Sequence, residues 1–258
     1  MTATASLPTA QNRSADPLLR TRDLSAGYGH LAAVRDLNME IHEGEIVALL
    51  APNGGGKTTI LMTLAGWLPP LAGDVFWRGV STSAPLFKRA RMGISLVTDA
   101  RSVFMGLTVA ANLKVGRGSP DRALELFPEL GPLLKRRAGL LSGGEQKMLA
   151  LALGLSSDPK LLLVDELSLG LAPLVVQRLL GALDDARRAG VAVILVEQQL
   201  QKALQIADRG YVLRRGRVEL EGTAAELQNR IDELRSQYIN RSGVSPASDY
   251  DAPGRRDD

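Results

Sequence analysis

The stretch EIVALLAPNGGGKTTILMTLAG, residues 45–66, constrains the fold of this chain more than any other. Its first six residues, Glu45–Leu50, have the nearly continuous apolar character of a strand buried on both faces. The residues after the glycines, KTTILMTLAG, have helical spacing. A buried strand, a glycine-rich loop and a helix in this order form the context that cradles a nucleotide phosphate. We therefore expect an α/β fold built around a phosphate-binding loop.

The residue types in this loop suit phosphate chemistry. Successive glycines allow the backbone N–H groups of residues 54–57 to converge on phosphate oxygens, and the helix N-terminus adds a favourable dipole. The Lys57 side chain would reach the β- and γ-phosphates, and the Thr58 hydroxyl would hold Mg²⁺. The candidate nucleotide-binding residues of the loop are Asn53, Gly54, Gly55, Gly56, Lys57, Thr58 and Thr59.

Ala51 departs from the loop pattern, which has glycine at its first position. At a negative φ this alanine would cost almost nothing, whereas at a positive φ it would cost about 1–2 kcal/mol. Taken alone, the loop leaves three interpretations open: a working nucleotide site, a damaged one, and a glycine-rich turn that holds no ligand.

Short apolar runs alternate with helical patterns along the rest of the chain, as is typical of an α/β domain. Between about residues 83 and 155 helical spacing prevails, apart from a short strand at 93–97, which predicts an inserted helical segment. The expected strands are residues 18–24, 37–41, 45–50, 73–78, 93–97, 161–164, 191–196, 210–213 and 217–221.

Two acidic residues follow the apolar run LLLV (161–164). A strand that ends in Asp165 and Glu166 places both carboxylates at the sheet edge where ligands bind in doubly wound sheets. Asp165 would hold Mg²⁺ through water, and Glu166 would orient and polarise the attacking water. A strand end with two solvated acids is the alternative for this stretch by itself.

The stretch LSGGEQ, residues 141–146, first indicates a capping box, with Ser142 as N-cap and Glu145 three residues on. Together, GKTT, LSGGEQ and LLLVDE, in this order, resemble the signature of ATP-binding cassette (ABC) ATPases. The resemblance runs from about Leu18 to Tyr238, and we expect the ABC ATPase domain to occupy residues 18–240. It implies a P-loop NTPase core with an antiparallel β subdomain and an inserted α-helical subdomain at about residues 83–155.

The resemblance also implies an ATP-sandwich dimer, in which Ser142 and Gly144 of one subunit close on the γ-phosphate held by the partner's loop. Tyr28, in AGYGH, resembles the aromatic residue that stacks on adenine, and an ordinary tyrosine at a strand end is the alternative. SLGLAP (168–173) resembles the D-loop that crosses the dimer interface. The signature residues implied to touch nucleotide are Ser142, Gly143, Gly144 and Gln146.

Two positions depart from the broad family. Asp99 stands where a glutamine usually faces Mg²⁺ and the transporter, and Gln198 replaces the switch histidine. The ATPase subunits of branched-chain amino-acid and related importers are similar in these places, and the chain shares VF, LTV, SLGLAP and VEQ with them. The positions that differ even from that subgroup are Ala51, Thr98, Asp99, Ala100 and Leu167.

We expect the changes at Asp99 and Gln198 to leave Mg²⁺ and phosphate binding in place. Asp99 keeps a carboxylate but is one methylene shorter than the glutamate typical of that subgroup. Gln198 can donate a hydrogen bond to the γ-phosphate but cannot carry a proton near neutral pH. ATP hydrolysis therefore remains the expected activity. The predicted catalytic residues are Glu166, Lys57 and Gln198. The predicted metal-binding residues are Thr58, Asp165 and Asp99.

Composition excludes several other chemistries. The chain has no cysteine and only two histidines, which excludes disulfides, thiolate metal sites, cysteine catalysis and a histidine cluster. No apolar run approaches the ~20 residues that cross a bilayer. Basic clusters such as residues 88–91 lack the interleaved aromatic residues that stack on bases, so we expect no nucleic acid. Residues 1–17 and 241–258 have the composition of a disordered lead-in and tail.

The predicted function is that of the ATP-hydrolysing subunit of an importer for amino acids or related small polar solutes, at the cytoplasmic face of the cell membrane. Its expected partners are membrane-spanning permease subunits, a second ABC ATPase in a hetero- or homodimer, and indirectly a solute-binding protein. The alternatives are an ATP-binding regulatory subunit with little turnover and a soluble ABC ATPase outside transport.

Overall fold

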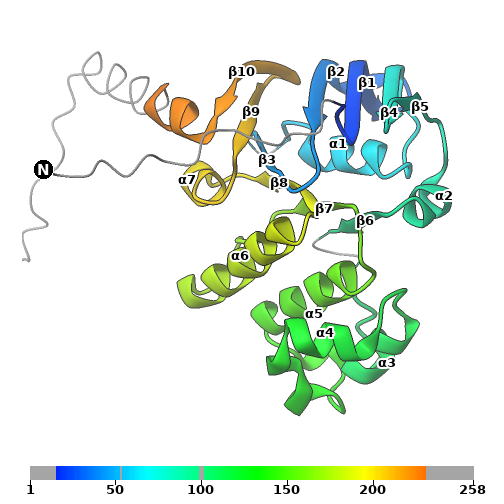
Figure 1. The fold of residues 1–258 in the computed structure, drawn as a ribbon, viewed down its shortest axis with the longest axis vertical. Coiled ribbons are helices and arrows are strands. Elements are labelled where there is room, and N and C mark those ends of the chain that lie inside the picture. The colour runs from blue at the N-terminus through cyan, green and yellow to red at the C-terminus, as the bar shows by residue number, and fades with distance from the viewer. Residues whose placement is uncertain (1–15, 53, 99–101, 231–258) are drawn as a thin grey trace, which may run out of the picture.

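The computed structural model describes residues 16–52, 54–98 and 102–230 of the chain. These residues form two β-sheets, the helices packed on them, and a group of helices that extends from one end of the molecule (Figure 1). The expected lead-in and tail lie almost wholly outside the described residues.

A six-stranded, mostly parallel sheet carries the core, in the order β10-β9-β3-β8-β7-β6. Every residue of β3, β7 and β8 is buried, as the unbroken apolar runs predicted. Only β10 runs antiparallel to its neighbour. The strands are β3 (Ile46–Leu50), β6 (Ile94–Val97), β7 (Leu161–Asp165), β8 (Ala192–Glu197), β9 (Arg209–Arg214) and β10 (Arg217–Thr223).

A second sheet of four antiparallel strands has the order β2-β1-β4-β5. The strands are β1 (Leu19–Tyr28), β2 (Leu31–Ile41), β4 (Ala72–Trp77) and β5 (Val80–Ser81). β1 and β2 are longer than the expected 18–24 and 37–41, because irregularities in their pairing after Thr21 and Leu24 let the ladder continue through polar residues. β5 was not expected, since two exposed residues give no alternating pattern.

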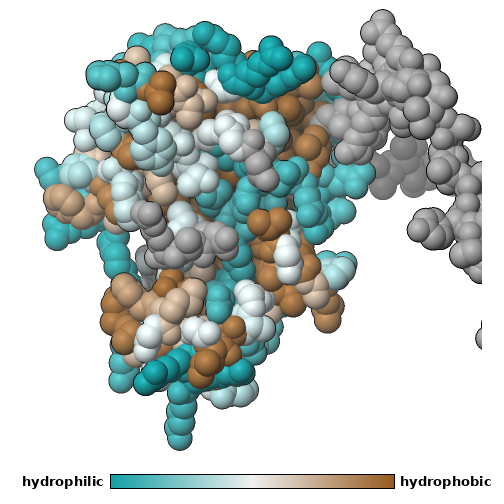
Figure 2. Space-filling view, turned by 180° about the vertical axis from the view of Figure 1, so that it is seen from behind, coloured by the Kyte–Doolittle hydropathy of each residue, from teal (hydrophilic) through white to brown (hydrophobic). Residues whose placement is uncertain are grey.

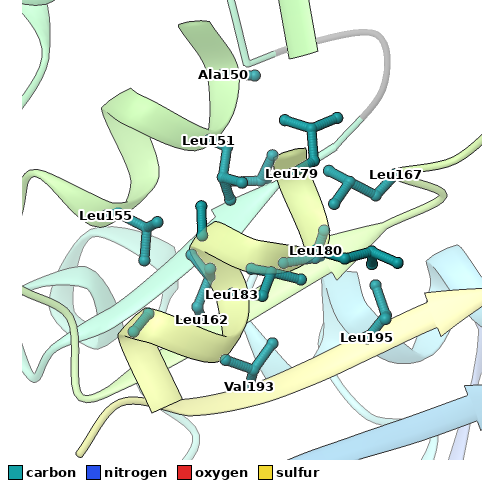
Figure 3. Close-up of a cluster of buried hydrophobic side chains, with 14 of the residues drawn as sticks. Ala150, Leu151, Leu155, Leu162, Leu167, Leu179, Leu180, Leu183, Val193 and Leu195 are labelled. Carbon is teal, nitrogen blue, oxygen red and sulfur yellow. The ribbon is translucent and has the colours of Figure 1, made fainter. Parts of the chain in front are cut away.

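Helix α1 (Lys57–Leu64) packs between the two sheets, where its buried residues join strand residues of both in one apolar cluster. On the other face of the parallel sheet, α5 (Gly143–Leu155) and α6 (Pro173–Arg188) form a second cluster (Figure 3). There Leu151 and Leu155 of α5 meet Leu179 and Leu183 of α6 over the strand residue Leu162. The short helix α7 (Leu200–Leu204) follows β8.

The helices at the end of the molecule lie between β6 and β7 in the chain (Figure 1). They are α3 (Val109–Val115), α4 (Pro120–Leu126), η1 (Pro128–Leu133) and η2 (Ala138–Leu140). Of these, α3, α4 and η1 pack on α5. Helix α2 (Leu86–Arg91) and β6 also fall within residues 83–155, and β6 pairs with β7 of the main sheet. The domain limits at residues 18, 83, 155 and 240 stay a prediction.

Apolar side chains are exposed around this helical end (Figure 2). Phe104 and Val115 are each 59% exposed, and Leu140 is 63% exposed. Within the described ranges every helix is too short or too polar to span a bilayer.

Candidate nucleotide-binding and hydrolysis site

The phosphate-binding loop connects the end of β3 to α1, as the sequence predicted. Gly56 precedes the first helical residue with φ +84°, and a Cβ added there would lie 2.4 Å from Val34 Cγ2, so this position requires glycine. No side chain caps α1, so its first backbone N–H groups are available to an anion. A pocket of about 370 Å³ opens at this point, lined by Ala33, residues 54–59 and Glu166.

Ala51 fits the loop without strain. It is 5% exposed and is not among the described residues with positive φ. A Cβ added at Gly55 would lie 2.8 Å from the Ala51 methyl, so the two residues are in close contact. Gly55 in turn donates its backbone N–H to Pro52 O at 3.0 Å. Asn53 lies outside the described residues.

The side chain of Lys57 folds back onto the loop that precedes it. Its ammonium group donates to the backbone oxygens of Ala51, at 2.9 Å, and of Pro52, at 3.2 Å. The same Nζ lies 3.3 Å from Glu166 Oε1. The structure therefore brings Lys57 of the loop next to Glu166, the second of the two predicted acids. Lys57 and Glu166 are more than a hundred positions apart in the chain.

Asp165 lies at the end of β7, where its Oδ2 accepts a hydrogen bond from Thr58 Oγ1 at 2.7 Å. Burial raises the pKa of this carboxyl, and the hydrogen bond from Thr58 offsets part of the rise. Its other oxygen, Oδ1, is buried and has no hydrogen-bond partner among the described residues. A buried carboxylate oxygen without a donor costs free energy unless a cation or water meets it.

Glu166 follows directly in a left-handed conformation, with φ +45°. Its backbone N–H donates to Val196 O at 3.0 Å, which ties the residue after β7 to β8. Its side chain is about a quarter exposed, and the residue lines the phosphate pocket. A non-glycine residue in this region is strained by about 1–3 kcal/mol and persists only where its surroundings hold it.

The signature residues lie at the start of α5. Ser142 caps this helix, and both hydrogen bonds of the predicted capping box with Glu145 are present. Gly144 is buried against α6, where a Cβ would lie 2.9 Å from Val175 Cγ1. The Gln146 amide donates to Leu141 O and Ala138 O, so it braces the turn before α5.

None of the signature residues lines the phosphate pocket of the same subunit. Gly143 and Gln146 instead line a separate pocket of about 170 Å³ beside the loop after β7, at residues 169–171. The four predicted signature residues therefore lie outside this subunit's own phosphate pocket.

Three predicted site residues remain: Tyr28, Gln198 and Asp99. Tyr28 ends β1, is 57% exposed, and donates its hydroxyl to Met62 Sδ at 3.6 Å. Gln198 is exposed immediately after β8. Asp99 lies outside the described residues.

Sequence reasoning missed two polar residues next to this site, Lys147 and Glu197. Each is an isolated charge at the edge of an apolar run, in KMLALALGL and AVILVE. Lys147 donates its ammonium group to Glu166 O at 2.7 Å, and both Glu197 oxygens accept hydrogen bonds from Ser168. The only signal in the sequence is a charged residue directly beside an apolar run.

A phosphate-binding loop between β3 and α1, with two carboxylates at the end of β7, which β8 separates from β3 in the same parallel sheet, defines a P-loop nucleoside triphosphatase. Comparison with known proteins specifies the family. Residues 34–168 match the model of the ABC transporter family.

Two relatives have high identity over most of their length. The branched-chain amino acid transport ATP-binding protein BraG of Pseudomonas aeruginosa is 43% identical over 226 residues, which cover 84% of this chain and 97% of that protein. The probable branched-chain amino acid transport ATP-binding protein LivF of Archaeoglobus fulgidus is 39% identical over 224 residues, which cover 81% of this chain and 94% of that protein. A solved nucleotide-free ATP-binding cassette from an ABC transporter superposes with a TM-score of 0.78 at 22% identity, covering 87% of this chain and 98% of its own.

The chain therefore belongs to the ABC transporter family. It is an ATP-binding, ATP-hydrolysing subunit of the transport-coupled kind. Such subunits dimerise and work with membrane permease subunits.

Proposed function

We propose that this chain is the energising subunit of an importer for branched-chain amino acids or related small polar solutes. The observation that carries the hydrolytic part is that Lys57, Thr58 and Glu166 line one pocket, while Asp165 accepts a hydrogen bond from Thr58. The solute class and the inward direction rest on the similarity to BraG and LivF.

In this proposal the loop residues bind the triphosphate. The backbone N–H groups at the start of α1 face the phosphates, and Lys57 leaves the carbonyl oxygens of Ala51 and Pro52 to meet the β- and γ-phosphates. Tyr28, exposed at the end of β1, offers its ring to adenine. Glu166 orients the attacking water, and Gln198, exposed after β8, donates to the γ-phosphate.

Magnesium fits the oxygen atoms at the end of β7. The described residues contain no group of three acidic, histidine or cysteine side chains that could hold a metal alone. The Thr58 hydroxyl and the unpartnered Oδ1 of Asp165 are hard oxygen donors, and Mg²⁺ ordinarily takes only one or two protein ligands beside water and phosphate. When bound, the ion would neutralise charge on the phosphates. Asp99 remains a proposed further ligand.

The second half of the catalytic site would come from another ABC ATPase. Ser142, Gly143, Gly144 and Gln146 lie at the N-terminus of α5, outside their own subunit's phosphate pocket. A partner subunit placed head to tail would therefore receive these residues at its γ-phosphate. The proposal includes both a homodimer and a heterodimer.

The membrane subunits would dock at the helical end. A groove of about 460 Å³ lies between the parallel sheet and α3, and exposed Trp67, Phe104 and Val115 line it. Apolar patches of this kind on a polar surface mark interaction sites. We place the subunit at the cytoplasmic face of the membrane, with a solute-binding protein contributing indirectly on the other side.

The test is the Mg-ATPase rate of the wild type beside Glu166→Gln and Lys57→Ala, with MgATP affinity measured in parallel. We expect turnover in the wild type, its loss in Glu166→Gln with affinity retained, and weakened binding in Lys57→Ala. A wild type as slow as Glu166→Gln, even with its membrane partners present, would instead identify a regulatory subunit. Uptake of labelled leucine into right-side-out vesicles that hold the complete complex, with ATP inside, tests solute and direction, and ATP-dependent release from these vesicles would refute import.

A further inference from the structure

The residues that follow β7 are held by two buried charged side chains that come from different elements. Glu166 is strained, with φ +45°, and its neighbours Leu167 and Ser168 are 1% and 2% exposed. Because a strained residue relaxes unless its surroundings over-determine it, the contacts of this segment set where the Glu166 carboxylate lies.

One of these contacts comes from α5. Lys147 is 9% exposed, and its ammonium group donates to the backbone oxygen of Glu166 at 2.7 Å. A hydrogen bond from a cation to a carbonyl oxygen is shorter and stronger than one between neutral groups. It acts on the peptide group of the strained residue itself, so it opposes rotation toward an unstrained φ.

The other contact comes from the end of β8. Glu197 is 2% exposed, and its two oxygens accept hydrogen bonds from the Ser168 N–H at 2.9 Å and the Ser168 hydroxyl at 3.0 Å. This buried carboxylate precedes Gln198, the predicted γ-phosphate contact. The segment is therefore held from two sides, by α5 through Lys147 and by the end of β8 through Glu197.

We propose that Lys147 is a positioning residue that couples the signature end of α5 to the catalytic carboxylate of the same subunit. The proposal rests on the proposed function, since it needs Ser142 to contact the partner's nucleotide. Ser142 and Lys147 are five positions apart on one rigid helix, about 7.5 Å along its axis. When α5 moves to bring Ser142 onto the partner's γ-phosphate, Lys147 moves with it and shifts the Glu166 backbone. Closure on one nucleotide thereby adjusts the water-orienting group at the other.

If Lys147 has this role, its loss should affect the rate of hydrolysis but not nucleotide binding or dimerisation. Removing the ammonium group should slow hydrolysis while leaving nucleotide binding and ATP-dependent dimerisation in place, because the phosphate-binding loop and Ser142 are untouched. Small displacements of a catalytic group are costly, and shifts of about 1 Å can reduce rates about 100-fold.

The experiment uses the full chain with its partner subunits and compares wild type, Lys147→Met, Lys147→Arg and the control Lys160→Met. Lys160 is an exposed lysine just before β7, at the far end of the strand that leads to Asp165. Single-turnover hydrolysis, MgATP affinity, ATP-dependent dimerisation and Tm are measured on each. We expect Lys147→Met to hydrolyse about tenfold more slowly, with MgATP affinity within threefold of wild type and dimerisation retained. Lys147→Arg should recover most of the rate, and Lys160→Met should match the wild type.

Two results would overturn the proposal: a Lys147→Met rate within twofold of wild type, or a rate loss accompanied by a similar fold-loss of MgATP affinity or of ATP-dependent dimerisation. If Lys147→Met does not fold, Lys147→Gln replaces it under the same criteria, since its amide is too short to reach Glu166 O. A wild type that does not hydrolyse MgATP refutes the proposed function itself. Normal wild-type hydrolysis with an unaffected Lys147→Met refutes only the coupling role.

Discussion

Replacing Ala51 with glycine creates the residue that the phosphate-loop pattern has at this position, and it tests whether the alanine impairs the site. In the structure Ala51 is buried and is absent from the described residues with positive φ, so glycine has no strain to relieve. The substitution removes a methyl group that is in close contact with Gly55. We therefore expect Ala51→Gly to lower stability without improving nucleotide binding.

The magnitude follows from two costs. A buried methyl group contributes about 0.8 kcal/mol. The extra backbone freedom of glycine in the unfolded chain costs about 0.4–1 kcal/mol. Together they predict a loss of about 1–2 kcal/mol in the free energy of unfolding, which for a domain of this size lowers Tm by roughly 2–8 °C.

The assay pairs urea unfolding with MgATP affinity and ATPase rate. Ala65→Gly is the matched control, because Ala65 is 1% exposed and lies at the far end of α1. We expect both variants to lose stability, and the affinity and turnover of Ala51→Gly to stay within about threefold of wild type. A tenfold or greater rise in affinity or turnover in Ala51→Gly would show that the alanine damages the cradle.

Three further predictions concern stability measured by urea unfolding. Phe127→Ala should cost about 3–5 kcal/mol because its ring is fully buried, whereas Phe87→Ala, at 59% exposed, should cost under about 0.5 kcal/mol; equal costs would contradict the packing argument. Gly73→Ala should cost about 2–4 kcal/mol, since φ is +74° and a Cβ would lie 2.3 Å from a backbone oxygen. The control Gly181→Ala, on α6 with open space around it, should stabilise by up to about 1 kcal/mol. Burial raises the pKa of Glu197 above its usual 4.5, so the stability that this carboxyl contributes is present below pH 4.5 and is lost as pH rises through the folded pKa. The unfolding free energy of wild type minus that of Glu197→Gln should therefore fall from pH 4 to pH 7, and a rise would refute the assignment.

The nucleotide site depends both on one local stretch of sequence and on contacts between distant parts of the chain. Lys57 and Thr58 belong to one local stretch, but the function of that stretch depends on the two acids at the end of β7. The parallel pairing of β7 with β8, and of β8 with β3, brings the ends of these strands to one edge of the sheet. The 2.7 Å contact between Thr58 and Asp165 is a product of that register.

Features set by neighbouring residues could be predicted from the sequence alone. The unbroken apolar runs indicated β3, β7 and β8, the glycines and Lys57 indicated the loop, and the spacing of Ser142 and Glu145 indicated the capping box. Backbone propensities, turn geometry and capping act over a few residues, and their signals are therefore readable in a single stretch. The order of three such stretches was enough to indicate the family.

What the tertiary structure alone decided depends on contacts between distant residues. The continuation of β1 and β2 beyond their apolar runs, the backbone conformation of Ala51, and the close contact of Lys147 with Glu166 all belong to this group. Lys147 and Glu166 are 19 positions apart, and Ser168 and Glu197 are 29 apart. Their meeting depends on how α5 packs on the sheet and on the register of β7 against β8. Strand register and helix packing are settled by side-chain fit across the whole core, to which each local stretch contributes only one side.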